Sequence, residues 1–287
     1  MSAPSISVIV PSYNQGLFLD RCLNSIASQE YDGRVEIIVV DDGSSDDSRS
    51  IARCHPTKPL VIEQANAGVS GARNAGAARA TGDILAFLDA DDRWLPGKLA
   101  AQAALHQAPT LSFTRYRRVS PEGLSVPNAA LHPSLSLVAT RENLLRQNFI
   151  GTSTVMVDRQ CFDGCGGFPQ THDLLKSGQD YALWLRIVGR FGCCYLPEVF
   201  TEYTVHTQNR VGVDPLKHLV GGLNALRSLS EWSPELFDAM SGGRSLAHLE
   251  RARKARLLKD LILKRKNFPR GSFVRFLDYV QTGDIPD

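Results

Sequence analysis

The sequence of 287 residues lacks any uninterrupted apolar run near the eighteen or so residues that a membrane-spanning helix needs. Its 32 Lys and Arg nearly balance its 30 Asp and Glu, so the net charge is only +2 and no overall field favours nucleic acid. Met1 is not followed by the charged, apolar and small-residue segments of a secretion signal. We therefore expect a cytoplasmic protein without a nucleic-acid partner, with any membrane contact peripheral and at the inner face.

Cysteine is scarce, and its six positions show no regular framework. Cys161, Cys165, Cys193 and His172 could be drawn as a zinc site, but their spacing is irregular. Small buried cysteines are common in protein cores. The pattern therefore favours reduced thiols over disulfides or zinc.

The first 110 residues alternate between strand-like and helical patterns. The chain is 43% hydrophobic, enough for a sizeable core. Such alternation favours right-handed βαβ crossovers and a parallel sheet covered on both faces. Predicted strands are 6–10, 35–40, 60–62 and 83–88, and predicted helices are 17–27, 44–53, 69–80 and 95–106.

Beyond residue 110 the rhythm changes, which makes a mixed sheet the expectation. Strand-like patterns at 112–119 and 154–157 flank a proline-containing loop at 120–139 and a short helix at 141–147. A glycine-rich loop at 163–178 leads into a helix at 179–190. We predict an α/β catalytic domain at 1–213, with halves 1–110 and 111–213, followed by a helical extension at 214–287.

The acidic stretch Asp89-Ala90-Asp91-Asp92 follows the apolar run 84–88. Clustered carboxylates repel one another and make physical sense mainly when a hard cation or a cationic partner neutralises them. If the segment is extended, alternation puts Asp89 and Asp91 on one side, where both could bind one Mg²⁺ or Mn²⁺ together with substrate phosphates. The alternative is that these acids merely cap the next helix.

Polar residues follow three of the predicted strands, at 11–14, 41–44 and 89–92. Ligands of open α/β sheets bind at the carboxyl ends of the strands. We therefore expect these three segments to meet in one crevice that holds a nucleotide-diphosphate substrate.

Four blocks of this sequence, in this order, resemble those of the family 2 glycosyltransferases. They are 8–14, 39–46, 66–76 and 83–92, of which the last is similar to the DxD block of the family. Similarity continues to about residue 210 through Gly166-Gly167-Phe168, 178–186 and Tyr203-x-x-His206. The resemblance implies a GT-A fold, a central mainly parallel mixed sheet with C-terminal helices, and inverting transfer of a sugar from a nucleotide diphosphate, with UDP favoured.

The first two blocks predict contacts with the nucleotide. Tyr13 could stack on the base, Pro11 stiffens the strand exit, and Asp41 could flank the pocket. Asp42 could accept a hydrogen bond from the base, and in the family the matching position contacts a uracil. The alternative is that Asp41 and Asp42 cap the helix that begins near Ser44.

Arg73, in the third block, is a further candidate for donor binding, although an ion pair with Asp89 or Asp92 is the open alternative. The complete set of predicted donor-binding residues is Pro11, Tyr13, Asp41, Asp42, Arg73, Asp89 and Ala90.

Asp180 is the predicted catalytic base, because it follows a loop at a helix start and matches the base position of the family. A solvated carboxylate titrates near 4, so Asp180 would be ionised at neutral pH. Its neighbour Gln179 departs from the Glu common in the family and could change acceptor choice. The alternative is a carboxylate that merely stabilises the helix start.

Three later residues complete the predicted site. His206 matches a family position whose imidazole can join the metal or the diphosphate, which suits Mn²⁺ better than Mg²⁺. Arg210 could contact phosphate, and Trp184 is either an acceptor-sugar platform or a core residue.

The segment 251–266 combines a basic face with leucines at helical spacing. It could rest on anionic lipid, bind a partner protein, or pack on the catalytic domain. The lipid interpretation agrees with the many family members that extend lipid-linked glycans, an argument by analogy.

The predicted function is metal-dependent sugar transfer to a glycan or lipid-linked acceptor, in bacterial surface polysaccharide or glycolipid assembly. A nucleotidyltransferase is disfavoured because 11–16 contains no Arg or Lys to bind a triphosphate. A catalytically silent carbohydrate-binding protein is disfavoured because Asp89, Asp91 and Asp180 are all present. A homodimer is left open.

Overall fold

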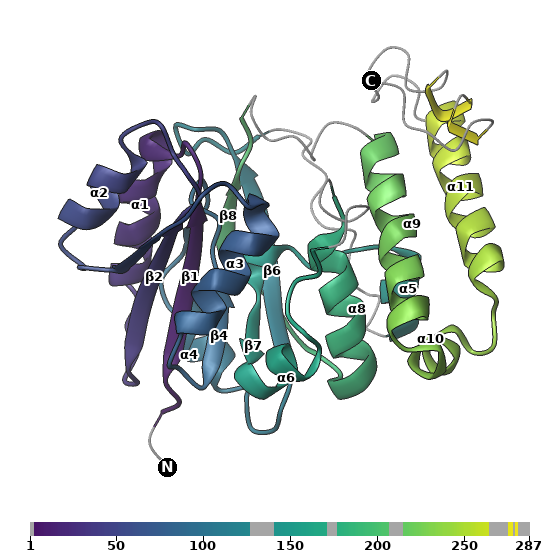
Figure 1. Cartoon of the computed structure of the whole chain (residues 1–287), viewed down its shortest axis with the longest axis horizontal. Helices are drawn as coiled ribbons and strands as arrows, with labels where there is room; N and C mark the ends of the chain where they lie inside the picture. Colours follow the sequence, from purple (N-terminus) through teal and green to yellow (C-terminus); the bar gives the residue numbers. More distant parts are fainter. Residues whose placement is uncertain are drawn as a thin grey trace.

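The computed structural model describes residues 3–126, 141–170, 177–206, 215–263, 275–277 and 279–280. In that part of the chain, eight strands form one sheet in the order β3-β2-β1-β4-β7-β6-β8-β5 (Figure 1). The strands are β1 Ile6–Ser12, β2 Val35–Asp41, β3 Leu60–Glu63, β4 Ile84–Phe87, β5 Arg93–Trp94, β6 Leu111–Val119, β7 Met156–Asp158 and β8 Cys194–Thr204.

The first half of the chain forms parallel strands, as its alternating pattern predicts. β1 pairs in parallel with β2 and β4, and β2 pairs in parallel with β3. All residues of β1 and β4 are buried, which is typical of apolar strands covered on both faces. The helices here are α1 Gly16–Ala27, α2 Ser48–Cys54, α3 Gly68–Arg79 and α4 Lys98–Ala103.

The second half makes the sheet mixed, which confirms the prediction. β7 is antiparallel to both β4 and β6, and β5 is antiparallel to β8, whereas β6 and β8 are parallel. The helical segments here are α5 Arg141–Arg146, the 3₁₀ turn η1 Thr152–Thr154, α6 Arg159–Gly164 and α8 Gln179–Phe191.

Three further helices, α9 Pro215–Trp232, α10 Pro234–Ser241 and α11 Leu246–Leu263, follow α8. Figure 1 shows α9 between α8 and α11, away from the parallel strands. Leu226 and Leu229 of α9 belong to the same hydrophobic cluster as Trp184 of α8, so α9 shares the core of the catalytic part. The predicted boundary at 213/214 lies outside the described residues.

Several predicted boundaries differ from the structure, in each case for a local reason. The segment 89–92 is a turn instead of an extended strand end, since the amide of Asp92 donates to the carbonyl of Asp89 at 2.9 Å. Residues 152–154 form η1, and β7 starts only at Met156. α4 begins at Lys98, after Gly97 with φ of +85°, a conformation that glycine adopts readily.

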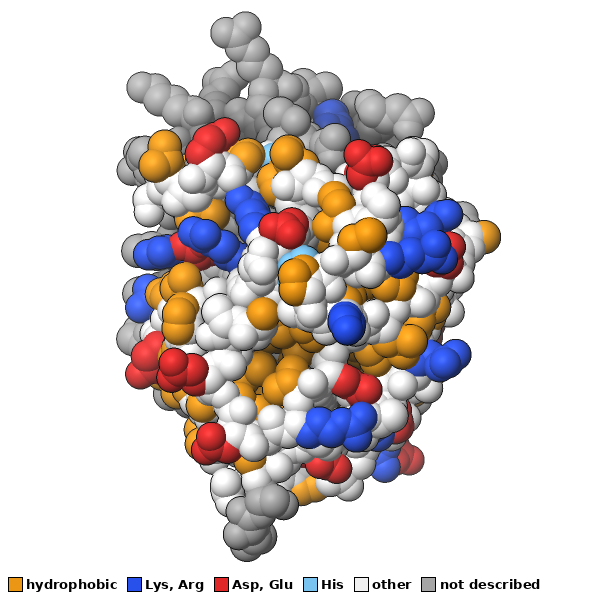
Figure 2. Space-filling view, turned by 90° about the vertical axis from the view of Figure 1, so that its left-hand side faces the viewer, with side chains coloured by type: hydrophobic (Ala, Val, Ile, Leu, Met, Phe, Trp, Pro, Cys, Tyr) orange, Lys and Arg blue, Asp and Glu red, His pale blue; other side chains and the backbone are white. Residues whose placement is uncertain are grey.

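The carboxyl ends of β1, β2 and β4 lie at one edge of the sheet, toward the top of Figure 1. Figure 2 shows the face that carries α1 and α2, where acidic and basic side chains are interspersed. None of the helices in the described ranges is both long and apolar enough to span a membrane.

Candidate active site

The end of β1 exposes an aromatic ring beside a buried strand. Pro11 is buried in β1, whereas the Tyr13 side chain just after the strand is 50% exposed. An exposed tyrosine at a strand end offers an open face to a planar ligand. The exposed ring of Tyr13 is available to a ligand, and its contact with a base stays a prediction.

Asp41 and Asp42, at the end of β2, are buried and have separate partners. Oδ2 of Asp41 accepts a hydrogen bond from Arg49 Nη2 at 3.1 Å, and its Oδ1 has no partner in the described part of the chain. Oδ1 of Asp42 accepts from the amide of Ala67 at 2.8 Å and from Gln64 Nε2 at 2.7 Å. Asp42 therefore fixes the start of α3, a role that the sequence did not predict.

The acidic turn after β4 gives each of its three carboxylates a different partner. Asp89 Oδ1 accepts from Arg73 Nη2 at 2.5 Å. Asp91 Oδ2 lies 2.8 Å from Nε2 of His206. The buried Asp92 accepts hydrogen bonds from Ser153 Oγ and from the amide of Thr204, at 2.6 and 2.9 Å.

The alternation argument for Asp89 and Asp91 is therefore wrong, because a turn does not place alternate side chains on one side. Among the residues that the structure describes, no three His, Cys, Asp or Glu side chains gather as a metal site. Asp91 and His206 do meet, and they offer an oxygen and a nitrogen, a donor pair that suits Mn²⁺. Two protein ligands are sufficient where substrate phosphates and water complete the coordination. Ala90, between the two acids, is buried.

The acidic turn concentrates negative charge at the strand ends. Burial, and then repulsion by Asp91 and Asp89, raises the pKa of Asp92 well above the ordinary carboxyl value. Burial raises the pKa of Tyr203 on β8, and the same three carboxylates raise it further. A site with this charge attracts cations.

Arg73 pairs with Asp89 of the acidic turn, and its charge also acts on Asp180. Its side chain on α3 is only 6% exposed, and its Nε has no partner within the described ranges. Arg73 lowers the pKa of Asp180, whereas Asp89 raises it, so both charges act on the predicted base. The ion-pair alternative for Arg73 is therefore present in the structure, and a donor contact stays a prediction.

Asp180 is less solvated than the sequence indicates. Burial is the largest effect on its carboxyl and raises the pKa above the ordinary value, despite the opposing effect of Arg73. Its Oδ2 lies 3.4 Å from Asn148 Nδ2 and 3.5 Å from Thr152 Oγ1. Asp180 is half-buried at the start of α8, so the expectation of a fully solvated carboxylate with the ordinary pKa is wrong.

The turn η1 links the base to the acidic turn, and sequence reasoning missed it. Thr152 contacts Asp180, while Ser153 donates to Asp92, so adjacent residues reach both groups. The Ser153 carbonyl accepts from Nε1 of the buried Trp94 at 2.7 Å, which holds the turn. The run of small hydroxyl residues at 152–154 was the available signal, but a strand-like pattern at 154–157 masked it.

The three candidates for the acceptor side have different positions. Trp184 is fully buried and packs on Phe87 and Phe168, with ring centroids 6.5 and 5.6 Å away, so it is a core residue and presents no sugar platform in this structure. Gln179 is buried at the first position of α8. Arg210 lies outside the described residues.

The basic helix α11 turns two of its arginines toward the catalytic part. Arg253 Nη2 donates to the carbonyl of Leu145 at 2.7 Å and lies over the ring of Tyr181. Arg256 donates to Gln147 Oε1 at 2.8 Å. These contacts agree with packing on the catalytic domain, whereas residues 264–266 lie outside the described part.

Comparisons with known proteins give the same fold and family. The family model "Glycosyl transferase family 2" matches residues 7–162. The chain is 31% identical over 211 residues to the putative teichuronic acid biosynthesis glycosyltransferase TuaG of Bacillus subtilis. This match covers 70% of this chain and 79% of TuaG. Among curated relatives, this chain spans between 30% and 79% of the relative's own length.

Two solved structures share the fold at low sequence identity. TarS 1–349 of S. aureus in complex with UDP superposes with a TM-score of 0.62 and 22% identity, covering 92% of this chain and 73% of that one. The mannosyltransferase PcManGT of Pyrobaculum calidifontis, in complex with GDP-Man and Mn²⁺, superposes with a TM-score of 0.61 and 19% identity. The match covers 98% of this chain and 79% of PcManGT. The predicted GT-A fold is confirmed, and the match over more than half of the chain shows that this protein belongs to glycosyl transferase family 2.

Proposed function

We propose that this glycosyltransferase is metal-dependent and inverting, and that it moves a sugar from UDP to an acceptor hydroxyl during surface-polysaccharide assembly. The observation that carries the proposal is the 2.8 Å approach of His206 Nε2 to Asp91 Oδ2 at the carboxyl ends of the parallel strands. A carboxylate and an imidazole at that edge form a site for a cation beside a bound diphosphate.

The donor proposal rests on the end of β1 and the start of α3. Tyr13 is exposed for stacking, and the buried Asp42 accepts a hydrogen bond from the amide of Ala67, just before α3. A carboxylate that accepts a hydrogen bond from the base N–H discriminates among nucleobases. The complex of TarS with UDP supports UDP as the donor nucleotide. Because PcManGT was solved with GDP-Man, a test of the donor must also include a GDP-sugar.

Asp91 and His206 would hold the cation, and Asp89 could join them through the oxygen that Arg73 does not occupy. A divalent cation bound there would neutralise charge on the leaving diphosphate. Arg73 itself keeps a guanidinium beside this region, with a buried Nε that has no partner in the described ranges.

Asp180 would accept the proton of the acceptor hydroxyl. Because burial raises its pKa, its carboxylate is a stronger base than a solvated aspartate, while still ionised at a pH above that value. Asn148 and Thr152 approach Oδ2 and would orient the carboxylate. A base that activates the acceptor for direct displacement of the diphosphate gives inversion at the anomeric carbon.

The proposed acceptor is a surface glycan, as the similarity to TuaG supports, and this glycan could be linked to a lipid in the membrane. Arg251 and Lys259 of α11 are exposed, unlike Arg253, and could contact anionic lipid. Sedimentation with vesicles of anionic and neutral lipid tests this contact. Equal binding to both would contradict it.

A thermal-shift screen with UDP-, GDP-, dTDP- and CMP-sugars, each with and without Mn²⁺, tests the proposed function. A ligand at a hundred times its Kd stabilises a protein by about 2.7 kcal/mol. We expect the largest increase in melting temperature for a UDP-sugar with Mn²⁺. An equal response without Mn²⁺ would contradict metal dependence, and a larger response to a GDP-sugar would contradict the donor proposal.

A further inference from the structure

Arg21 of α1 joins three segments that are far apart in the sequence. Its Nη1 donates to the carbonyl of Pro121 at 2.6 Å, after the end of β6. Its Nη2 donates to the carbonyl of Asp91 at 2.9 Å and to Thr204 Oγ1 at 2.6 Å. One guanidinium thus fixes the acidic turn relative to the end of β8, two residues before His206.

A second series of contacts leads from the same helix to His206. The Arg21 guanidinium lies 4.8 Å from the centre of the Phe18 ring. Phe18 stacks on the His206 ring, with centroids 4.9 Å apart and planes at 27°. His206 in turn meets Asp91, so Arg21, Phe18, His206 and Asp91 form a closed ring of contacts. Phe18 and Arg21 are three residues apart and therefore share one face of the helix.

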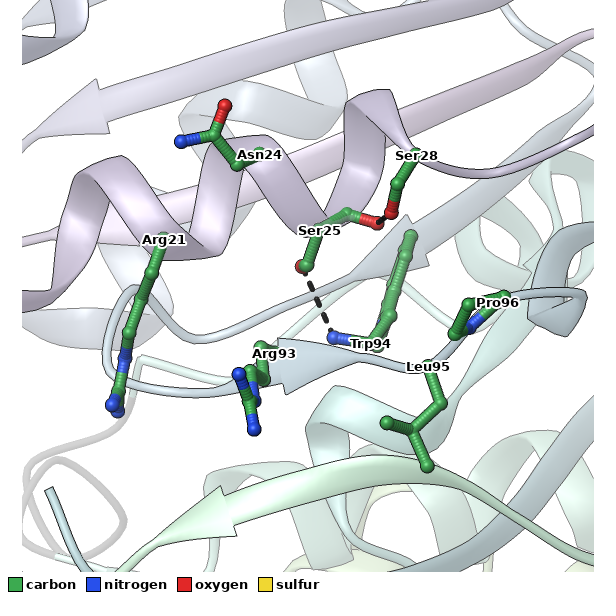
Figure 3. Close-up of a pocket in the computed structure, with 8 residues that line it drawn as sticks. All are labelled: Arg21, Asn24, Ser25, Ser28, Arg93, Trp94, Leu95 and Pro96. Carbon is green, nitrogen blue, oxygen red and sulfur yellow. Dashed lines mark hydrogen bonds between the residues drawn. The ribbon is translucent and has the colours of Figure 1, made fainter. Parts of the chain in front are cut away.

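Two polar side chains of the pocket beside Arg21 already have partners within the fold. It has a volume of about 310 Å³ and lies between α1 and β5, with Arg21 and Arg93 close together in Figure 3. Arg93 pairs with the buried Glu202, and Ser25 Oγ accepts from the amide of Trp94 at 3.1 Å. The pocket therefore offers a neighbouring arginine as a control for Arg21.

We infer that Arg21 is a positioning residue that holds Asp91 and His206 together for cation binding. The inference rests on the proposed metal site. Asp91 and Asp92 both attract Arg21, so its positive charge lies near the carboxylates and by itself opposes the binding of a cation. Removal of this charge would tighten cation binding if electrostatics alone acted, whereas loss of positioning would weaken it.

Titration of Mn²⁺ in the presence of UDP, followed by electron paramagnetic resonance, separates these two effects. We expect Arg21→Met to weaken Mn²⁺ binding roughly tenfold, the lower end of the loss found for residues that orient metal ligands. Arg21→Lys keeps the charge and should restore part of the affinity. Arg93→Met removes a neighbouring charge without touching Asp91 or His206, and should bind Mn²⁺ at least as tightly as the unaltered protein. Unchanged or tighter binding by Arg21→Met would overturn the inference.

A metal-free readout keeps this test independent of the proposed function. The ring-proton NMR signals of His206, assigned with His206→Gln, report its stacking on Phe18. We expect them to shift in Arg21→Met and in the milder Arg21→Lys, while the signals of His55 stay in place. If the unaltered protein binds no Mn²⁺ but these signals shift, the metal proposal fails and the positioning role stands. Unmoved His206 signals in both folded variants would overturn the positioning role.

Discussion

His206 Nε2 lies 2.8 Å from Asp91 Oδ2, although 115 residues separate the two in the sequence. The contact joins the acidic turn after β4 to the segment after β8. Both side chains are mostly buried, at 8% and 16% exposed, so the pair is arranged before any ligand binds. Pre-arranged ligands reduce the entropy lost when a cation binds.

Asp42 fixes the start of α3 and is proposed to bind the base, and substitutions can separate these two roles. Asp42→Ala should weaken nucleotide binding even without metal, because the proposed partner of its carboxylate is the base. Gln64→Ala removes one of the hydrogen bonds to Asp42 Oδ1 but keeps the carboxylate, and is the matched control. Calorimetry with UDP and the melting temperature of each variant provide the measurements. If Asp42→Ala lowers only the melting temperature, its role is confined to fixing α3.

Asp180→Asn should lower turnover by roughly 10²- to 10⁴-fold while the Kd for nucleotide hardly changes, because it removes the proton acceptor and keeps the side-chain size. Steady-state transfer and nucleotide binding should be measured in parallel. The control is Asp163→Asn, which changes an exposed carboxylate near the end of α6 and should keep normal turnover. Near-normal turnover of Asp180→Asn would place the base elsewhere.

The pH profile of transfer should report the environment of Asp180. Since its pKa is raised, the active carboxylate is lost as the pH falls through a value above that of an ordinary aspartate. Arg73 lowers this pKa, so Arg73→Met should move the acidic limb of kcat to higher pH. Arg79→Met, exposed on the same helix, should leave the limb in place. A limb that does not move in Arg73→Met would argue against Asp180 as the titrating base.

Trp184 should affect stability and not acceptor binding. Trp184→Ala should lower the free energy of unfolding by about 3–5 kcal/mol, as for other buried large aromatic residues. Trp184→Phe retains part of the packing on Phe87 and Phe168 and should leave the acceptor KM unchanged. Urea unfolding and acceptor kinetics give the two readouts. A raised KM in a stable Trp184→Phe protein would instead favour a role in the acceptor site.

The parallel half of the fold is predictable because its signals are local. The runs that form β1 and β2 are apolar and β-branched, and the helices between them have periodic apolar faces. That β1, β2 and β4 all end at one edge of the sheet follows from their parallel pairing, whereas a crevice shared by Asp41, Asp42 and the acidic turn stays a prediction. Short elements such as β5, η1 and α6 are missed, because two- to six-residue segments carry little periodicity.

Apart from the Arg73–Asp89 ion pair, the partners of the site residues could not be predicted from local patterns. Ser153 bonds to Asp92 across 61 residues, and Asn148 and Thr152 reach Asp180 across 32 and 28. A residue type and its spacing indicate a charge, whereas its solvation is set by the tertiary structure.

The central claim, that Asp91 and His206 bind a divalent cation with the donor, is tested most directly by calorimetry of Mn²⁺ in the presence of UDP. Asp91→Asn and His206→Gln should each weaken Mn²⁺ binding by roughly 10- to 100-fold, at least the loss caused by changes to the groups that orient metal ligands. Asp32→Asn, an exposed carboxylate before β2, should bind as the unaltered protein does. Unchanged Mn²⁺ affinity in both Asp91→Asn and His206→Gln would contradict the claim.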